Sequence, residues 1–583
     1  MRSLSFLARL GAITALLAGG VLWTGCDSNG GDDPPDDPPT TTLTDLVEGN
    51  EDLSTLATAL DAAERAETLA DETATFTVFA PSNAAFQSIN VDVLIENPEL
   101  LGEVLDFHVV QGEALAAGDL SDGDVLTTVQ GDDLTVRIDE DGNVFVEGAP
   151  VTTANVEADN GIAHVIGDVM LTNRTAAERL QVTAATQQLF QAVSDAGLAG
   201  AFANPDNEWT TFAPENEAFE NADLSGFTDE EIQGLLQYHV LDGVTDSEAL
   251  VQLLADNDGQ VSVPTLQGEE VTITEQDDGS IVFNGGQATL TLDRVDQRAG
   301  NGIIHQIDGL LVPPSQTRRV SYELGANAND GALPDGVNGT VTFWEAGAEQ
   351  TVVTLELEGG ATGADSLAHP AHIHNNSADE GGGIAIFLTP IDGNGGGGTS
   401  ARVVNRPFDE LASFDGHINI HESVENLQNV VSQGDIGANA AGTLGKGLDL
   451  VENPRTDEFP LEANSNDGSI APNGIPGTVT FRELTDAITL VTVSLDPGTS
   501  DGSTGAAVSH PAHIHNNSVA EGGGIEFFLS PVDGSDAAAR SSKLVGESFD
   551  FLSGFDGHVN VHESNAALQN IVSNGNVGAN GGS

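Results

Sequence analysis

The chain contains almost no cysteine and almost no lysine. Its 583 residues include one cysteine, Cys26, and two lysines, Lys446 and Lys543. A single cysteine excludes an internal disulfide and any structural zinc site built from several thiolates. The 17 Lys and Arg residues stand against 91 Asp and Glu residues, which gives a formal net charge of −74. Because nucleic-acid binding depends on cations that neutralise phosphates, we expect no nucleic-acid partner.

The acidic residues are expected to lie on the surface of a folded protein rather than in a disordered chain. Hydrophobic residues make up 39% of the chain, which is enough for ordinary cores. An excess of acids suits salty water, because high ionic strength screens the repulsion between surface charges. The composition therefore indicates a halophile, and an acidic protein of an ordinary organism is the alternative. At roughly 150 residues per domain, the length predicts about four domains.

The amino terminus is typical of an export signal. Arg2 and Arg9 precede an apolar stretch at 10–23 that is too short to span a bilayer comfortably. Residues 1–25 are therefore predicted to be a signal peptide that takes the protein out of the cytoplasm.

The end of this stretch also suggests a lipid anchor. Its last letters, LWTGC, resemble the lipobox of bacterial lipoproteins, in which the cysteine is acylated, although Trp23 stands where leucine is usual. The resemblance implies that Cys26 carries lipid and holds the protein on a membrane of the cell envelope, at the outer membrane or cell surface. An ordinary signal peptide with an incidental cysteine is the alternative. Residues 26–42, rich in Asp and Pro, are predicted to be an extended acidic tether.

Two different units each occur twice, and the first pair spans residues 43–173 and 178–315. Each copy has three blocks in the same order. Copy one has TFTVFAPSNAAF at 75–86, FHVV at 107–110 and NGIAHVI at 160–166, and copy two has WTTFAPENEAF at 209–219, YHVL at 238–241 and NGIIHQI at 301–307. The first block has an alternating strand pattern that ends in a Pro turn, and in copy one a helical pattern from Leu46 to Ala66 precedes it.

These blocks resemble the fasciclin domain. The resemblance implies a compact α+β unit, a wedge of strands with several helices, that serves adhesion at cell surfaces and in extracellular matrices. The aromatic-His step of the family matches at Tyr238-His239, whereas Phe107-His108 lacks the tyrosine hydroxyl. We expect the four histidines of these blocks to be buried imidazoles that hydrogen-bond to the backbone: His108, His164, His239 and His305.

The second pair spans residues 319–440 and 457–580. The copies share GTVTF at 339–343 and 477–481, HPAHIHNNS at 369–377 and 510–518, FDGHINIHES at 414–423 with FDGHVNVHES at 555–564, and a closing IGAN or VGAN. Segments with a period of two alternate with glycine-rich turns, which predicts strands. This unit resembles the CHRD domain, the chordin-type repeat, and the resemblance implies a β-sandwich and no defined biochemical role. The predicted fold class is therefore two α+β fasciclin-like domains followed by two all-β sandwiches.

Ten of the 14 histidines lie in this second pair, five in each copy. The candidate metal ligands are His369, His372, His374, His417, His421, His510, His513, His515, His558 and His562. On a strand, residues i and i+2 share a face, so His372 lies beside His374 and His417 shares a face with His421. If the two strands are neighbours, three or four imidazoles converge at distances that suit zinc or copper. The alternative is a polar seam in which the histidines satisfy each other and the backbone without metal.

The motifs do not indicate an enzyme. The one Gly-x-Ser-x-Gly match, GTSDG at 498–502, has no helix pattern after it, which a nucleophile elbow needs. Adhesion or matrix binding is the leading predicted function, with a cell-surface or matrix protein or a polysaccharide as partner, since tandem domains gain avidity. The alternative is a histidine-based zinc or copper module of the cell envelope. A purely architectural spacer would need neither ligand nor metal.

Overall fold

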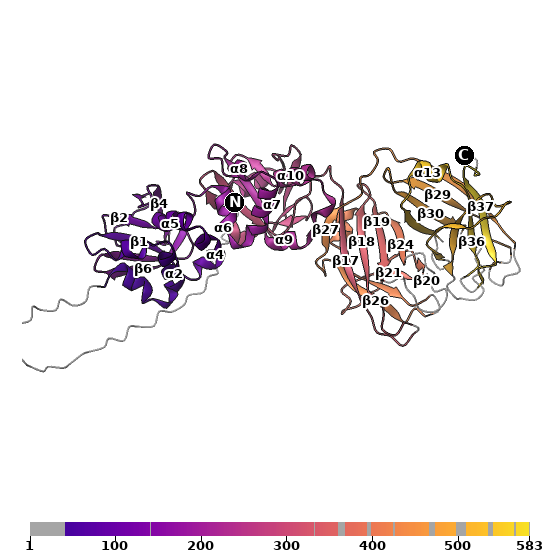
Figure 1. The fold of residues 1–583 in the computed structure, drawn as a ribbon, viewed down its shortest axis with the longest axis horizontal. Coiled ribbons are helices and arrows are strands. Elements are labelled where there is room, and N and C mark those ends of the chain that lie inside the picture. Colours follow the sequence, from indigo (N-terminus) through magenta and orange to yellow (C-terminus); the bar gives the residue numbers. More distant parts are fainter. Residues whose placement is uncertain are drawn as a thin grey trace, which may run out of the picture.

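The computed structural model describes residues 41–139, 141–331, 333–358, 368–392, 398–423, 426–465, 471, 473–496, 509–533, 540–564 and 567–581. The predicted signal peptide, Cys26, all of the tether up to residue 40 and the segment 498–502 lie outside these residues. Four bodies follow one another in a row, two with helices and strands and then two built almost wholly of strands (Figure 1). We call them the first to the fourth domain in chain order.

The first domain packs helices against a seven-stranded sheet with the order β2-β1-β7-β6-β5-β4-β3. Its elements are α1 (Leu43–Glu48), η1 (Glu51–Leu53), α2 (Ser54–Ala62), α3 (Ala66–Leu69), β1 (Phe76–Pro81), η2 (Ala85–Ser88), α4 (Val91–Glu96), α5 (Pro98–Phe107), β2 (Val109–Gln111), β3 (Val125–Thr127), β4 (Asp133–Ile138), β5 (Val144–Val146), β6 (Ala149–Ala158) and β7 (Gly161–Ile166). Strands β1 and β7, which carry two of the repeated blocks, pair in parallel at the centre of the domain.

Two local details of this domain differ from the sequence patterns. The helical pattern from Leu46 to Ala66 is broken into short helices, because α1 ends at Gly49 and the Asn50 side chain then caps the next turn. Strand β1 has no exposed face despite its alternating letters, and all six of its residues are buried. Phe76, Val78 and Ala80 pack in one core with residues of the helices, and Phe79 packs in a second core with residues of β4 and β5.

The second domain repeats this plan with two four-stranded sheets, β10-β8-β16-β15 and β11-β12-β13-β14. Its elements are α6 (Ala176–Val182), η3 (Ala184–Thr186), α7 (Gln187–Asp195), α8 (Ala199–Phe202), β8 (Trp209–Pro214), α9 (Asn216–Glu220), β9 (Ala222–Asp223), η4 (Leu224–Gly226), α10 (Asp229–Tyr238), β10 (Val240–Asp242), α11 (Ser247–Asp256), β11 (Gln260–Pro264), β12 (Glu270–Glu275), β13 (Ile281–Phe283), β14 (Ala288–Thr289), η5 (Leu292–Arg294), β15 (Gln297–Ala299) and β16 (Gly302–Ile307). Strands β8 and β16 pair in parallel, as β1 and β7 do.

The third domain has two facing antiparallel sheets, β27-β17-β18-β19-β24 and β26-β25-β21-β22. Its elements are β17 (Arg318–Ala326), β18 (Gly339–Glu345), β19 (Thr351–Leu357), β20 (Ala368–His369), β21 (Ala371–Asn375), β22 (Ile384–Phe387), β23 (Ile391–Asp392), β24 (Thr399–Val404), α12 (Phe408–Ala412), β25 (Asp415–His421), β26 (Val430–Gly437) and β27 (Thr443–Lys446). Buried residues of both sheets, such as Phe343 and Ile418, form one core.

The fourth domain repeats the third, with sheets β28-β29-β30-β35 and β37-β36-β32-β33. Its elements are β28 (Thr456–Ala463), β29 (Gly477–Glu483), β30 (Thr489–Leu495), β31 (Ser509–His510), β32 (Ala512–Asn516), β33 (Ile525–Phe528), β34 (Val532–Asp533), β35 (Arg540–Val545), α13 (Phe549–Ser553), β36 (Asp556–His562) and β37 (Ile571–Gly578). An ion-paired arginine braces the same place in both copies: Arg318 contacts Glu345 and Asp409, and Arg455 contacts Glu483 and Asp550.

A single sheet runs through the last three domains. Strand β9 of the second domain pairs with β27, where Leu444 lies opposite Ala222, and β24 of the third domain pairs with β35 of the fourth. Ion pairs reinforce the first of these junctions, with Lys446 Nζ 2.9 Å from Glu231 and Arg319 2.5 Å from Asp223. Backbone pairing at both junctions joins these domains into one continuous body.

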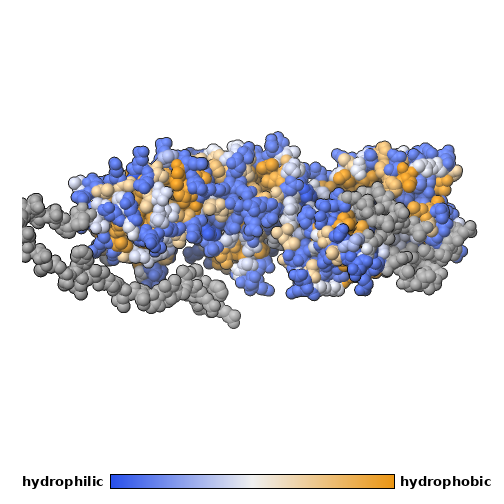
Figure 2. Space-filling view, turned by 60° about the horizontal axis from the view of Figure 1, so that its bottom comes forward, coloured by the Kyte–Doolittle hydropathy of each residue, from blue (hydrophilic) through white to orange (hydrophobic). Residues whose placement is uncertain are grey.

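The face of the molecule in Figure 2 is mostly hydrophilic, and its hydrophobic residues gather in separate spots over each domain. This surface agrees with the acid-rich composition, because the apolar residues are used mainly in the cores.

Candidate metal centres

The two histidine-rich blocks of the third domain lie on neighbouring strands. Strands β21 and β25 are antiparallel partners, with His374 opposite His417 and His372 opposite Asn419. The fourth domain repeats this register on β32 and β36, where His515 lies opposite His558. The condition on which the convergence of imidazoles depended is therefore met in both copies.

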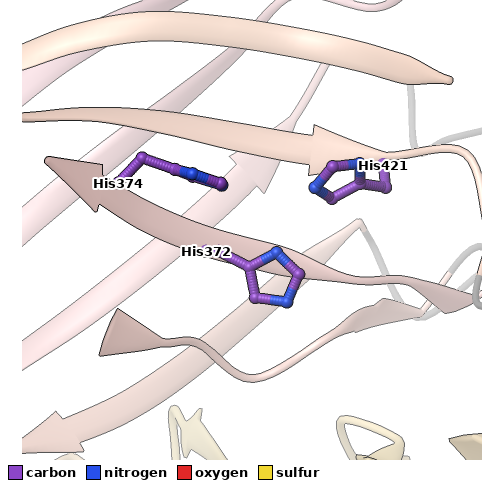
Figure 3. Close-up of side chains that lie close together, drawn as sticks. All are labelled: His372, His374 and His421. Atoms are coloured by element: carbon purple, nitrogen blue, oxygen red, sulfur yellow. The ribbon is translucent and has the colours of Figure 1, made fainter. Parts of the chain in front are cut away.

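Three imidazoles converge in each domain. His372, His374 and His421, which we call centre 1, each offer one ring nitrogen, and these nitrogens all lie within 4.8 Å of one another. Figure 3 shows the three rings close together on adjacent strands. His513, His515 and His562 form the equivalent centre 2. With a small movement of the rings, all three nitrogens can lie at roughly 2.0 to 2.1 Å from one shared zinc ion, which is the length of a zinc–imidazole bond.

Among the residues that the structure describes, one buried nitrogen of each ring in centre 1 has no hydrogen-bond partner: Nδ1 of His372, Nε2 of His374 and Nδ1 of His421. Centre 2 has the same three unpartnered atoms, on His513, His515 and His562. A buried polar atom without a partner costs about 1 to 3 kcal/mol. Six such atoms at equivalent positions are the pattern expected where a ligand supplies the missing bonds.

Backbone contacts hold two of these rings ready to bind. His374 Nδ1 donates to the carbonyl of Gly382 at 3.0 Å, which leaves the lone pair on Nε2, and His515 does the same with Gly523 at 3.1 Å. A metal-bound histidine usually donates its other ring nitrogen to a carbonyl in this way. The glycine carbonyls that perform this role were not expected from the sequence, since any residue supplies a carbonyl.

Burial keeps the imidazoles of both centres neutral. Desolvation, followed by repulsion from neighbouring histidines, lowers the pKa of His372 and of His513 to about 4. Burial also lowers the pKa of His374 and His421, against the opposing effect of a backbone hydrogen bond to each. Neutral imidazole is the form that coordinates a metal ion.

The other four candidate ligands lie outside the two groups and support them. His369 Nδ1 donates to the carbonyl of His421 at 3.1 Å, and His510 makes the same contact with His562. His417 donates to the carbonyl of Asn376 at 2.8 Å and stacks on His374, with ring centroids 5.0 Å apart. The equivalent contacts of His558 are with Asn517 and His515.

The donor set narrows the choice of ion. Each group contains imidazoles alone, with no carboxylate or thiolate from the described residues. Ca²⁺ and Mg²⁺ prefer oxygen ligands, whereas zinc and copper accept imidazole. The rings of Phe387 and Phe528 pack edge-on against His372 and His513 at 5.0 Å and shield one side of each centre. The sequence indicated these two phenylalanines only through their recurrence in both copies.

The histidines of the first two domains have different surroundings. His239 Nδ1 donates to the carbonyl of Leu235 at 2.8 Å, and its Nε2 accepts from the backbone N–H of Leu311 at 2.9 Å. His108 makes the same two bonds with Val104 and Met170.

The other two histidines of these domains are also bonded at both nitrogens. His164 donates from Nε2 to Leu115, and His305 donates from Nε2 to Thr245. Their Nδ1 atoms accept from Asn155 and Asp296. All four histidines are therefore buried and hydrogen-bonded to the backbone, as expected from the sequence.

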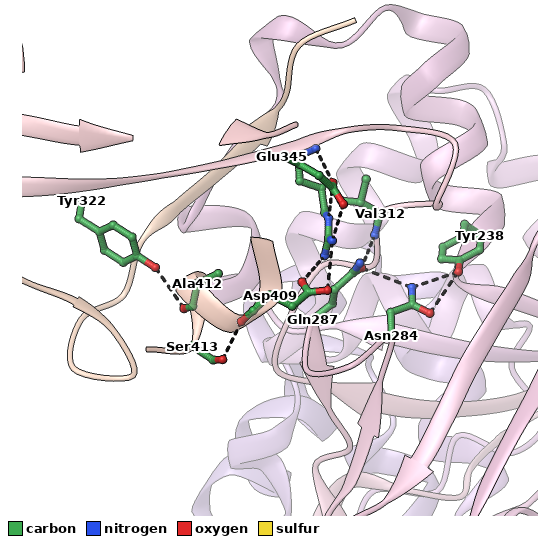
Figure 4. Close-up of polar contacts among 10 residues, drawn as sticks. Tyr238, Asn284, Gln287, Val312, Tyr322, Glu345, Asp409, Ala412 and Ser413 are labelled. Atoms are coloured by element: carbon green, nitrogen blue, oxygen red, sulfur yellow. Dashed lines mark hydrogen bonds and ion pairs between the residues drawn. The ribbon is translucent and has the colours of Figure 1, made fainter. Parts of the chain in front are cut away.

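The tyrosine of the aromatic-His step anchors a small network (Figure 4). The Tyr238 hydroxyl donates to the carbonyl of Glu270 at 2.9 Å and meets Asn284, whose side chain also contacts Gln287. Gln287 in turn accepts from the backbone N–H of Val312. Phe107 is 1% exposed in the first domain and has no hydroxyl for such contacts.

None of the described helices is long and apolar enough to cross a membrane.

Comparison with known proteins finds one family and several similar proteins. The family described as "Fasciclin domain" matches residues 51–172 and 184–313. Transforming growth factor-beta-induced protein ig-h3 of Sus scrofa is 30% identical over 266 residues, 44% of this chain and 37% of that protein. Protein sll1483 of Synechocystis is 41% identical over 135 residues, 22% of this chain and 73% of that protein. A fasciclin domain pair from the insect cell adhesion molecule fasciclin I covers 46% of this chain and 95% of its own, with 20% identity and a TM-score of 0.24.

Proposed function

Because the chain belongs to the fasciclin-domain family, we propose that it is an extracellular adhesion or matrix-binding protein rather than an enzyme. The observation that carries the proposal is the presence of two successive fasciclin domains, at 51–172 and 184–313. The family resemblance implies adhesion at cell surfaces. The partner in this proposal is a cell-surface or matrix protein or a polysaccharide.

The arrangement of the domains supports this role. Backbone pairing joins the second, third and fourth domains, so the chain presents its domains along one elongated body. Several weak contacts along one body add up through their effective concentration. A net charge of −74 also makes copies of the chain repel one another and so disfavours non-specific association. Attachment then depends on specific contacts with the partner.

Beads that carry the full chain test adhesion directly. We expect saturable attachment to cells or matrix of the source organism, competed by the free chain. The His239→Ala variant, which weakens the second domain, is expected to lower attachment. The matched variant His372→Ala/His513→Ala, which alters only the third and fourth domains, is expected to retain it. Failure of the wild-type beads to attach would contradict the proposal.

The proposed anchor is a lipid on Cys26, after removal of the signal peptide 1–25, with the acidic tether 26–42 between the membrane and the first domain. The lipobox-like letters LWTGC support it. Mass spectrometry of the amino-terminal peptide is expected to show an acylated Cys26, and Cys26→Ser is expected to release the protein from the envelope. An unmodified cysteine would leave an ordinary secreted protein.

The domain boundaries proposed for the folded part are 43–173, 178–315, 319–440 and 457–580. The repeated strand orders of the last two domains support their assignment as CHRD-like sandwiches.

As a second function, we propose that centres 1 and 2 each bind one zinc or copper ion. The six equivalent buried nitrogens without partners favour this function over a polar seam, in which they would be paired. The metal would supply positive charge and Lewis acidity at the sheet of each domain.

Metal content of the full chain, measured after exposure to zinc or copper and dialysis, tests this function. We expect about two ions per chain, one for each three-ligand centre. His372→Ala and His513→Ala are expected to remove one ion each, and the double variant both. Each single variant is the control for the other. A wild-type chain that retains no metal would assign the histidines to packing.

A further inference from the structure

The third and fourth domains meet through the same surface. At the junction, β24 and β35 run antiparallel, and Ala401 lies opposite Ser542. Both strands have six residues, and both of these residues are third in their strand. Each residue therefore faces its own equivalent in the other copy.

The apolar contacts around this pair have the same symmetry. One hydrophobic cluster spans the junction and contains equivalent residues from both domains. Val352 and Leu490 are each second in their strand, β19 and β30, and both are buried. The remaining equivalent pairs in the cluster are Ala346 with Leu484, which follow β18 and β29, and Val403 with Leu544, which are fifth in β24 and β35.

A contact of this type is isologous, as in a two-fold symmetric homodimer: the same patch is used on both sides. Tandem domains that follow one another head to tail bring two different patches into contact, one from each domain, because a head-to-tail arrangement has no two-fold symmetry. The junction also covers the free edge of each sheet, β24 on one side and β35 on the other, which would otherwise expose unpaired backbone groups.

We propose that this patch, formed by β24 with the start of β19 and by β35 with the start of β30, is a self-recognition surface whose partner is another copy of the same unit. The chain supplies that partner in tandem, and a second chain can supply it in trans. This inference does not depend on adhesion or on metal binding.

The linker explains why the tandem partner is favoured within one chain. Residues 447–455 separate β27 from β28, and Leu448 and Leu450 of this segment pack in the cluster at the junction. A short linker gives the tandem partner a high effective concentration, so pairing in trans becomes visible only when the pairing within the chain is blocked.

Charges placed at the symmetric pair test the surface in the full chain. The variants are Ala401→Lys/Ser542→Lys and Ala401→Asp/Ser542→Asp, which set like charges directly opposite each other within the chain. Each variant alone is expected to open the junction and to remain at the mass of one chain. An equimolar mixture is expected to form a complex of two chains, since each lysine then faces an aspartate of the other chain. The control Ala401→Lys/Ser542→Asp pairs opposite charges within one chain and is expected to stay closed and monomeric.

Sedimentation velocity reports the mass, and hydrogen exchange reports whether β24 and β35 are open while the core strands β25 and β36 remain protected. A mixture that stays at the mass of one chain while both like-charge variants are open would overturn recognition in trans. Like-charge variants that remain closed would overturn the surface itself. If protection of β25 or β36 is lost, the single variants Ala401→Lys and Ser542→Asp replace the first set, because each places only one unpaired charge at the symmetric pair. Their equimolar mixture is expected to form the same complex of two chains, in which the lysine of one chain faces the aspartate of the other.

Discussion

Buried histidines occur in both halves of the molecule, but their surroundings differ. In the first two domains, His108 and His239 use both ring nitrogens in hydrogen bonds to the backbone. In the last two domains, His372 and His513 each keep a buried nitrogen without a partner in the described part of the chain. Burial alone therefore does not distinguish a structural histidine from a binding one. The two kinds differ in whether the second ring nitrogen has a hydrogen-bond partner.

The comparison predicts effects of different size when a histidine ring is removed, and this is the largest difference that we expect. His239→Ala leaves the carbonyl of Leu235 and the N–H of Leu311 unpaired in a core, at about 1 to 3 kcal/mol each. We expect the free energy of unfolding of the second domain to fall by about 4 kcal/mol. In the absence of metal, His372→Ala leaves no hydrogen-bond partner unpaired at Nδ1 and costs mainly the packing of its ring, so the third domain is expected to lose less stability than the second.

Hydrogen exchange followed by mass spectrometry resolves these effects domain by domain, which matters because a four-domain chain does not unfold in two states. Equal losses of protection in the second and third domains would contradict the distinction between the two kinds of histidine.

Lowering the pH is expected to destabilise the first two domains. Burial lowers the pKa of His108 and His239 to about 4, from an ordinary value of 6.5. Between these values the unfolded chain binds more protons than the folded one, so stability falls as the pH falls from about 6.5 to 4. The loss is on the order of 3 kcal/mol per histidine. Denaturation followed across this pH range checks it, and a His239→Gln variant is expected to show a shallower slope for the second domain.

Metal is expected to stabilise only the last two domains. At a free ion concentration 100 times the dissociation constant, binding adds about 2.7 kcal/mol to each domain that holds a centre. Zinc titration with exchange measured on β21 and β32 should show this protection, and β1 and β8 serve as internal controls. Equal protection of all four strands would point to a general effect of cations on an acidic chain.

The aromatic-His step provides the smallest test. Tyr238→Phe removes the hydrogen bond to Glu270 and is expected to cost about 1 kcal/mol in the second domain. The reciprocal Phe107→Tyr places a hydroxyl among buried residues of the first domain and is expected to destabilise it slightly rather than to improve it. Thermal unfolding of both variants compares the two copies directly. A gain in stability on Phe107→Tyr would show that the first domain holds an unused partner.

Much of the candidate site could be predicted from residue spacing. The two-residue period of a strand places His372 beside His374 wherever the strand lies, and the recurrence of both blocks implied two equal centres. Which four of the ten histidines would support the others was not predictable. That choice depends on hydrogen bonds from His369 and His417 to carbonyls distant in sequence.

Some parts of the fold do not follow from the sequence patterns. The alternating letters of β1 did not reveal that both of its faces are covered, because the covering residues come from the helices and from β4 and β5 elsewhere in the chain. The helical pattern from Leu46 to Ala66 did not reveal the break at Gly49, because capping by Asn50 competes locally with a continuous helix.

By itself, the sequence determined the number and order of the repeats, their relationship to the fasciclin family and the alignment of histidines along each strand, since these depend on local period and composition. Only the tertiary structure decided which nitrogens remain without partners and that Ala401 meets Ser542 across a symmetric junction. The physical reason is that a hydrogen-bond partner or a packed surface is set by residues far apart in the chain, which local patterns do not specify.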